Sequence, residues 1–221
     1  MNIDLGTDTL RLPLIRIYQT SFYNNYLAGQ VDFNFLNNSY QPYNGGAPYF
    51  NPGTNLFTRI GILDLFEDYK LTGGFRFAGN FDSNEYLLSL ENLKGRFDKQ
   101  ITYHRMTFNS SNDTAYFKIH SDNLYLTLTK AFSPVLALKG TASYRFDKYV
   151  FLSTDVQTLS SRDIQRHWAG LKGELVYDNT RKLNINIYSG TRFKIFGEYY
   201  KEINRKLSDM IVLGADFRYY Q

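Results

Sequence analysis

The sequence predicts an all-β protein whose strands follow one another as an antiparallel meander. Apolar and polar residues alternate with a period of two along most of the chain, which is typical of strands with one dry face and one wet face. Tyr, Phe and Trp make up 17% of the 221 residues, and aromatic residues favour strands. Segments rich in Asn, Asp, Gly, Ser and Pro separate the alternating runs, as expected of turns.

The predicted strands of the N-terminal half are runs in which every second residue is apolar. Residues 1 to 22 form a lead-in that alternates poorly and contains Pro13, and residues 38 to 55 form a loop rich in Gly, Pro and Asn. The clear runs are YLAGQVDFNFL (26 to 36), YKLTGGFRFAG (69 to 79), EYLLSLEN (85 to 92) and DNLYLTLTK (122 to 130).

The same alternation continues through the C-terminal half, where Gly and Ala take some of the apolar positions. With the strands of the first half, these runs give ten or eleven predicted strands. The C-terminal runs are VLALKGTASYRF (135 to 146), WAGLKGELVYD (168 to 178), INIYSGTRFKIFGEY (185 to 199) and MIVLGADFRYY (210 to 220).

Short connections fix the predicted direction of neighbouring strands. A parallel connection needs a crossover of about a dozen residues or more, and no segment of that length shows a helical period. Adjacent strands therefore pair antiparallel, and without a linker rich in Pro, Gly or Ser the chain is expected to form a single domain over residues 1–221. The turn segments are Asn51-Pro52-Gly53, Asp82-Ser83-Asn84, Asn109 to Asp113, Ser133-Pro134 and Asp178-Asn179-Thr180.

Composition excludes several classes of protein. No run approaches the ~20 consecutive apolar residues of a spanning helix, whereas a spanning β-strand needs only about 9 to 11 residues. The chain has no cysteine, and its net charge of +4 is spread along the sequence, so neither a disulfide scaffold nor a nucleic-acid partner is predicted. The segment after Met1 lacks a secretory signal. Either a signal has been removed or the chain starts inside a longer protein.

Three observations favour lipid as the surroundings of the apolar row. Ten or more strands enclose a lumen too wide for side chains alone to fill easily. The apolar rows of residues 69 to 79, 136 to 146 and 185 to 199 carry no Lys or Arg, which would cost about 2 to 4 kcal/mol each at the bilayer midplane. Tyrosines stand at the strand ends, where interfacial girdles belong: Tyr69, Tyr86, Tyr177, Tyr199 and Tyr219.

The sequence thus predicts a transmembrane β-barrel of about 10 to 11 strands. A soluble lipocalin-type barrel or a β-sandwich, either of which turns the apolar row inward, remains an alternative. In the barrel the predicted lipid-facing residues are Phe33, Phe75, Phe77, Leu126, Leu138, Leu171, Phe193, Ile195, Leu213 and Phe217. The predicted lumen-lining residues are Asp32, Arg76, Glu91, Arg145, Lys172, Glu174, Arg192, Lys194, Glu198, Asp216 and Arg218.

No catalytic, cofactor or metal site is predicted. His104, His120 and His167 lie on separate predicted strands without a metal-ligand spacing. Nothing marks any of the serines as a nucleophile with a histidine and an orienting group beside it. The glycines, such as Gly73-Gly74, precede no helix that would present its amide groups to a phosphate. A non-enzymatic protein is expected.

Several stretches go beyond the general barrel pattern. They are IRIYQTSFYNNYLAGQVDFNFLNNSYQ (15 to 41), DLFEDYKLTGGFRFAGNFDSNEYLLSLENL (64 to 93), HWAGLKGELVYDNT (167 to 180) and SGTRFKIFGEYY (189 to 200). These stretches resemble the barrel of a Bacteroidota outer-membrane family, in which a periplasmic Tol-like β-propeller precedes a barrel of the bacterial surface antigen type.

The resemblance covers nearly the whole chain. It implies a barrel in the Gram-negative outer membrane, in contact with membrane lipid and with a periplasmic domain or protein partner. The wider superfamily, which includes the outer-membrane assembly barrels, is implied to have sixteen strands and a lumen loop with an Arg-Gly-Phe tip. This chain has fewer predicted strands and no Arg-Gly-Phe tripeptide, so it resembles the first two-thirds of such a barrel.

Three functional hypotheses follow. The first is a non-enzymatic integral outer-membrane barrel that serves as a membrane anchor or as a component of a protein assembly or translocation system. The second is a passive pore whose charged lumen selects solutes. The third is a soluble all-β binding module.

Overall fold

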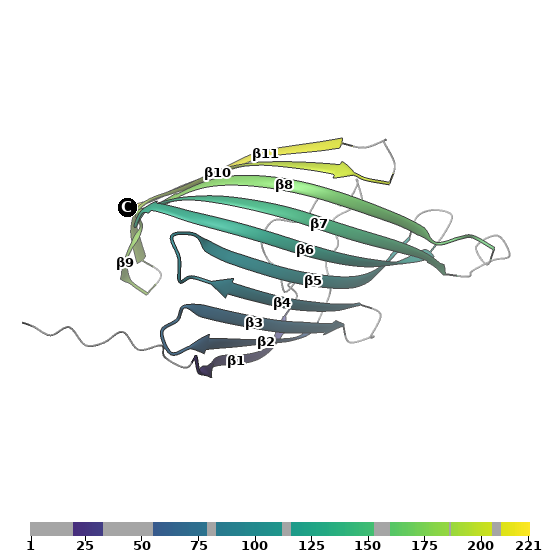
Figure 1. Cartoon of the computed structure of the whole chain (residues 1–221), viewed down its shortest axis with the longest axis horizontal. Helices are drawn as coiled ribbons and strands as arrows, with labels where there is room; N and C mark the ends of the chain where they lie inside the picture. The colour runs from purple at the N-terminus through teal and green to yellow at the C-terminus, as the bar shows by residue number, and fades with distance from the viewer. Residues whose placement is uncertain are drawn as a thin grey trace, which may run out of the picture.

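The structure, a computed structural model, contains one large antiparallel sheet (Figure 1). Eleven strands occur among the residues that it describes, and they follow one another as a meander. This arrangement confirms the predicted all-β meander and the predicted number of strands. The described residues are 20–32, 55–78, 83–111, 116–152, 160–185, 187–204 and 209–221.

The strands differ in length, and those in the middle of the sheet are the longest. They are β1 (Phe22–Asp32), β2 (Asn55–Asp64), β3 (Tyr69–Ala78), β4 (Asn84–Asn92), β5 (Asp98–Ser111), β6 (Tyr116–Ser133), β7 (Leu136–Leu152), β8 (Ile164–Asp178), β9 (Arg181–Asn184), β10 (Ile187–Glu202) and β11 (Asp209–Tyr220).

Sequential neighbours pair along the whole sheet, with one branch. The order is β1 to β8, then β10 and β11, and β9 pairs only with the first residues of β10. The sequence pattern predicted one uninterrupted strand over residues 185 to 199. Instead, β9 and β10 form a short hairpin before β10 reaches β8 at Arg192, which pairs with Asp178.

The described strands form an open sheet. β1 and β11 each have one neighbour and do not pair with each other, so the expected closure into a barrel is not present in the described part of the chain. The sheet is nevertheless strongly curved along its strand order, and its two edges bend away from the central strands (Figure 1).

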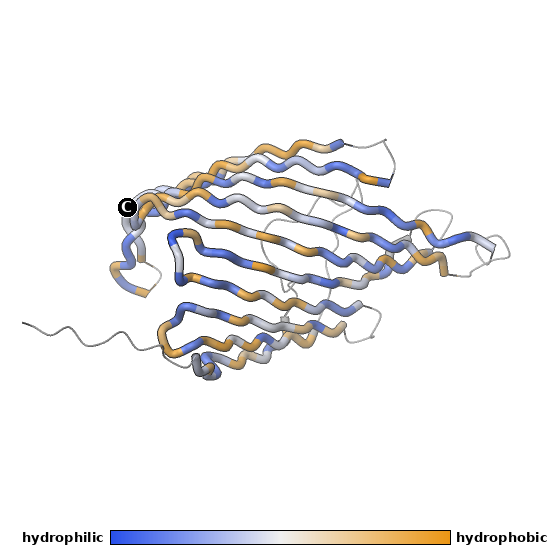
Figure 2. Tube along the Cα trace, viewed as in Figure 1, coloured by the Kyte–Doolittle hydropathy of each residue, from blue (hydrophilic) through white to orange (hydrophobic). Residues whose placement is uncertain are grey.

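Alternation gives the sheet two different faces. Successive side chains of a strand point to opposite faces, and the antiparallel register places like residues beside one another. Leu71, Leu90, Ile101 and Leu126 are consecutive partners across β3 to β6. We call their side of the sheet the apolar face and the other side the polar face. Figure 2 shows the alternation along each strand.

The two ends of the sheet differ in the length of their connections. At one end the strands are joined through residues 65–68, 93–97 and 134–135 and, between β8 and β10, through the longer segment that contains β9, and we call it the short-turn end. The connections at the other end, the long-loop end, span residues 33–54, 79–83, 112–115, 153–163 and 203–208. The C-terminal residues of β11 lie at the short-turn end (Figure 1).

A small apolar cluster covers the polar face near the long-loop end. Met106, Phe108 and Ile119 are buried there, and Phe117 and Tyr149 pack against them. β5 and β6 continue beyond the clear alternating run at 122 to 130. In this continuation the apolar side chains of the cluster occupy the row that is polar elsewhere in the two strands.

Candidate functional site

One face exposes apolar side chains while the other buries charged ones, an arrangement that we call reversed burial, although apolar side chains such as Phe108 are also buried on the polar face. On the apolar face Leu171 is 66% exposed and Leu213 is 79% exposed. On the polar face Arg76 is 1% exposed and Glu85 is completely buried. Charged side chains are almost never fully buried unless they are paired, so the partners of these two residues define the candidate site.

A network of three ionisable side chains forms the centre of the polar face. Arg76 Nε donates to Glu85 Oε2 at 2.7 Å, and Arg76 Nη2 donates to Ser83 Oγ at 3.1 Å. The other carboxylate oxygen, Glu85 Oε1, lies 2.5 Å from His104 Nε2. Arg76 and Glu85 are cross-strand partners in β3 and β4, and His104 lies on the adjacent strand β5. The carboxylate is thus bonded from both sides.

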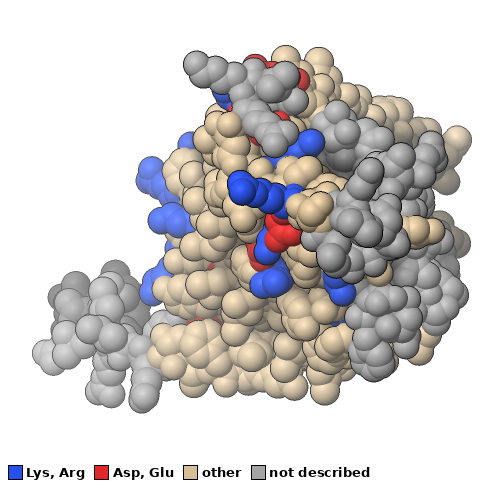
Figure 3. Space-filling model, turned by 90° about the vertical axis from the view of Figure 1, so that its right-hand side faces the viewer, with Lys and Arg blue, Asp and Glu red and all other residues tan. Residues whose placement is uncertain are grey.

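The network continues towards β7 through neutral groups. Asn123 Nδ2 donates to the backbone carbonyl of His104 and to Ser121 Oγ, both at 3.3 Å. Asn123 is the cross-strand partner of Arg145, and Arg145 Nε donates to Asp147 Oδ1 at 2.8 Å. Figure 3, which looks onto the long-loop end, shows basic and acidic side chains gathered near the centre of the molecule.

A second group of charges lies on the polar face towards the short-turn end. Glu174 Oε1 is 3.3 Å from Lys172 Nζ and 3.7 Å from Lys194 Nζ. Both ammonium groups also lie over the ring of Phe196, which is buried. The remaining pairs, Arg192 with Asp178 and Arg218 with Asp216, are more exposed.

The contacts of these charged side chains and of the histidines suit a structural role in packing and charge pairing better than a catalytic role. No group of three or more His, Asp or Glu residues that suits a metal ion occurs in the described ranges. Each histidine has a different partner: Glu85 for His104, Thr107 for His120 and Tyr144 for His167. None of these contacts includes a serine that a histidine activates, as a hydrolase would need.

The structure places the predicted lumen residues together on the polar face. Every predicted lumen residue whose side chain is described lies on that face, from Arg76 in β3 to Arg218 in β11, as the register of the strands shows. The predicted lipid-facing residues that are described, from Phe75 to Phe217, lie on the apolar face. The side chain of Asp32 and the whole of Phe33 lie outside the described residues.

Glu85 and Asp147, which make some of the closest contacts of the network, are not among the predicted lumen residues, and for His104 the sequence argued only against a metal-binding role. The alternation contained a usable signal for Glu85, because this residue lies in the same polar row as Glu91 in β4. For His104 the signal was weaker, since its neighbour Arg105 gives β5 a polar residue on each face.

The apolar face is organised as an aliphatic band between two aromatic rows. Tyr86, Tyr103 and Tyr144 form the row nearer the long-loop end. Tyr144 lies at this row and Leu136 at the other, and at about 3.4 Å per residue the path between them along β7 is about 27 Å. At a strand tilt of about 40° this path would correspond to a height of about 21 Å. The second row contains Phe97, Phe132, Tyr177, Phe193 and Phe217.

Glycines on the polar face accommodate aromatic rings from neighbouring strands. Tyr26 faces Gly61, Tyr200 faces Gly170, and Phe196 faces Gly214, each as a direct cross-strand pair. A Cβ at Gly170 would lie 2.4 Å from the ring of Tyr200 and 2.4 Å from Ser143 Oγ. The absence of a side chain therefore lets the ring lie flat on the strand.

We expect Gly170→Ala to lower the free energy of unfolding by about 1 to 3 kcal/mol, because the added methyl group must displace Tyr200 or Ser143. Gly173→Ala, three residues further along β8, is the matched control, since a Cβ there meets nothing within 4 Å. The midpoint of urea unfolding, followed by the fluorescence of Trp168, measures both variants. Equal midpoints for the two variants would show that the ring does not need the glycine.

The described ranges contain no helix long and apolar enough to cross a membrane. Comparison with known proteins adds no relative: no family model, no curated protein and no solved structure matches the chain.

Proposed function

We propose that the chain forms the wall of an integral outer-membrane β-barrel and has no enzymatic activity. The observation that carries this proposal is the reversed burial of the two faces. Many exposed Leu and Ile side chains cover one face of a sheet whose opposite face buries Arg76 and Glu85. Large contiguous patches of exposed apolar side chains are rare on soluble monomers. Lipid tails are a medium in which such patches are stable.

The dimensions of the apolar face support the same proposal. If the strands take the tilt of about 40° that is usual in outer-membrane barrels, the band between the aromatic rows is about 21 Å high, close to the apolar belt of about 25 Å that such barrels present to lipid. Such barrels have short turns on the periplasmic side and longer loops outside. The short-turn end, with Tyr220 and the turn at 134–135, is then periplasmic.

The open edges need partners in a bilayer. Unpaired backbone groups of β1 and β11 cost several kcal/mol each in hydrocarbon. We propose that the edges close, either with each other or through additional strands that enlarge the barrel towards the sixteen strands of the superfamily that the sequence resembles.

An anchoring or assembly role fits the polar face better than a wide pore does. Arg76, Glu85 and Asp147 are each at most 1% exposed, so the charged side chains fill the space beside the central strands and bond to one another. A membrane anchor, or a component of a protein assembly or translocation system with a periplasmic partner, follows as the proposed role.

Membrane extraction tests the proposal. We expect the chain, expressed in a Gram-negative host with a secretion signal, to stay in the outer-membrane fraction after washing with sodium carbonate and to need detergent for solubility. Planar bilayers that contain the purified chain should show no steady conductance. A chain that is monomeric and folded in plain buffer would instead support the soluble binding module, and a stable open conductance would support the pore.

A further inference from the structure

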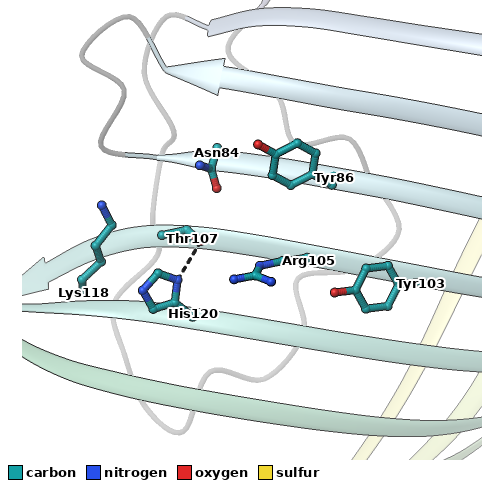
Figure 4. A pocket seen from close by; sticks show the side chains of 7 residues that line it. All are labelled: Asn84, Tyr86, Tyr103, Arg105, Thr107, Lys118 and His120. Atoms are coloured by element: carbon teal, nitrogen blue, oxygen red, sulfur yellow. Dashed lines mark hydrogen bonds between the residues drawn. The ribbon is translucent and has the colours of Figure 1, made fainter. Parts of the chain in front are cut away.

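A polar pocket interrupts the apolar face at the aromatic row of Tyr86, Tyr103 and Tyr144, which we call the upper aromatic row, on its long-loop side. It has a volume of about 520 Å³ and lies over β4, β5 and β6, towards the long-loop end. Figure 4 shows the side chains that line it. They are Asn84, Tyr86, Tyr103, Arg105, Thr107, Lys118 and His120.

The lining is basic and rich in hydrogen-bond groups. Arg105, Lys118 and His120 come from neighbouring strands and surround the pocket together with neutral amide and hydroxyl groups (Figure 4). His120 Nδ1 is 3.1 Å from Thr107 Oγ1. On β7, Lys148 is the cross-strand partner of His120 and adds a further ammonium group beside the pocket.

Two acidic side chains pair with cations around the pocket, one closely and one loosely. Arg105 Nε is 3.8 Å from Asp122 Oδ1, which is beyond hydrogen-bond distance, while the hydroxyl of Tyr103 donates to the same oxygen. Asp163 lies 2.9 Å from Lys148 Nζ. Within the described ranges Lys118 makes no salt bridge. Lys118, together with the guanidinium of Arg105 that is only loosely paired with Asp122, therefore remains able to bind an anion.

The level of the pocket on the sheet indicates where that anion comes from. The pocket lies next to Tyr86 and Tyr103, which belong to the upper aromatic row, and on its long-loop side. Tyrosines of outer-membrane barrels lie at the depth of lipid headgroups, and the long-loop end belongs to the outer leaflet. A cationic pocket on the outer surface at this depth faces headgroups rather than lipid tails.

We propose that this pocket binds the phosphorylated sugar headgroup of an outer-leaflet glycolipid. Arg105 and Lys118, which lie at different levels of the pocket, bond to phosphate groups of the headgroup, since charge-assisted hydrogen bonds to phosphate are strong and Arg can make two at once. The amide of Asn84 and the hydroxyls of Tyr86 and Thr107 suit the sugar. This inference rests on the proposed membrane-barrel function.

The test uses the full chain reconstituted in phosphatidylcholine bicelles, with insertion checked first by resistance to protease. Three probes are titrated and followed by native mass spectrometry. They are diphosphorylated lipid A, the same lipid without phosphates, and glucose 1-phosphate as a soluble sugar phosphate. We expect tight binding of the first probe only.

The variants are chosen so that the fold is preserved. Lys118→Gln removes a cation that makes no salt bridge in the described ranges, and Arg105→Gln with Lys118→Gln removes both phosphate ligands. Lys130→Gln is the matched control, because Lys130 lies on the same face at the short-turn end, beside Phe97 and Phe132. The double variant should bind diphosphorylated lipid A at least about tenfold more weakly, and the control should stay within about twofold.

The outcomes separate this inference from the proposed function. A chain that does not insert into the bicelles overturns both. A chain that inserts but binds the phosphate-free lipid equally well, or whose double variant keeps full affinity, overturns the pocket alone. Binding of glucose 1-phosphate as tight as that of lipid A would overturn the assignment to a membrane lipid.

Discussion

Leu126→Arg should abolish stable membrane insertion of the chain. Leu126 lies in the aliphatic band of the apolar face, between Ile101 and Ala142 on the neighbouring strands, and it is 48% exposed. An arginine on the lipid face of a barrel costs about 2 to 4 kcal/mol at the bilayer midplane and less towards the interfaces, and Leu126 lies inside the band, one residue pair from the row of Tyr103 and Tyr144. The same change on the surface of a water-soluble protein would alter stability by at most about 0.5 kcal/mol. The size of the destabilisation therefore distinguishes lipid from water as the neighbour of this face.

Folding into phosphatidylcholine vesicles, followed by the shift in electrophoretic mobility between folded and unfolded chain, measures the effect. Thr129→Arg is the matched control, since Thr129 lies on the same strand but on the polar face, opposite Asp98. This control should insert like the unmodified chain. If Leu126→Arg folds normally and becomes more soluble without detergent, the apolar face does not contact lipid.

Glu85→Ala should destabilise the folded chain by about 3 to 5 kcal/mol, because it leaves buried positive charge without its partner. Arg76 loses its carboxylate ligand, and His104 loses the bond at Nε2. Glu85→Gln should cost less, since the amide oxygen still accepts a hydrogen bond. The free energy of unfolding in urea, measured on the chain in vesicles, gives these values.

Glu91→Ala supplies the comparison on the same strand and the same face. Glu91 is only partly buried, and Gln100 Nε2 donates to it at 3.3 Å, so its removal should cost about 0 to 1 kcal/mol. A loss at Glu85 no greater than the loss at Glu91 would mean that water reaches Arg76 and His104 and replaces the carboxylate.

Alternation was sufficient to predict the strands and their two faces, because side-chain direction in a strand follows sequence parity, and the short connections predicted the antiparallel meander. Leu126 and Phe217 could be assigned to one face and Arg76 and Asp216 to the other without knowledge of the pairing. The signal weakened where both rows are apolar. In β2, Phe57 and Leu63 are buried on the polar face, and this strand was not among the clear runs.

Contacts between strands could not be predicted in the same way. The bond between Glu85 and His104 depends on the register of β4 against β5, which the turn over residues 93–97 sets. A change of one residue in that turn would move His104 to the other face. The pocket at Arg105 and Lys118 was missed for a related reason, since it arises from polar residues that occupy positions of the apolar row.

The pairing order of the sheet also determines how the chain can assemble. Each strand from β1 to β7 pairs with the strand that follows it, so every contact within this part closes a local stretch of polypeptide. Such topologies have a low entropic barrier to folding, because hairpins can be added one at a time. Any pairing between the first and last strands would be the exception, since it must bring together residues from opposite ends of the polypeptide. That seam is then expected to be the slow step.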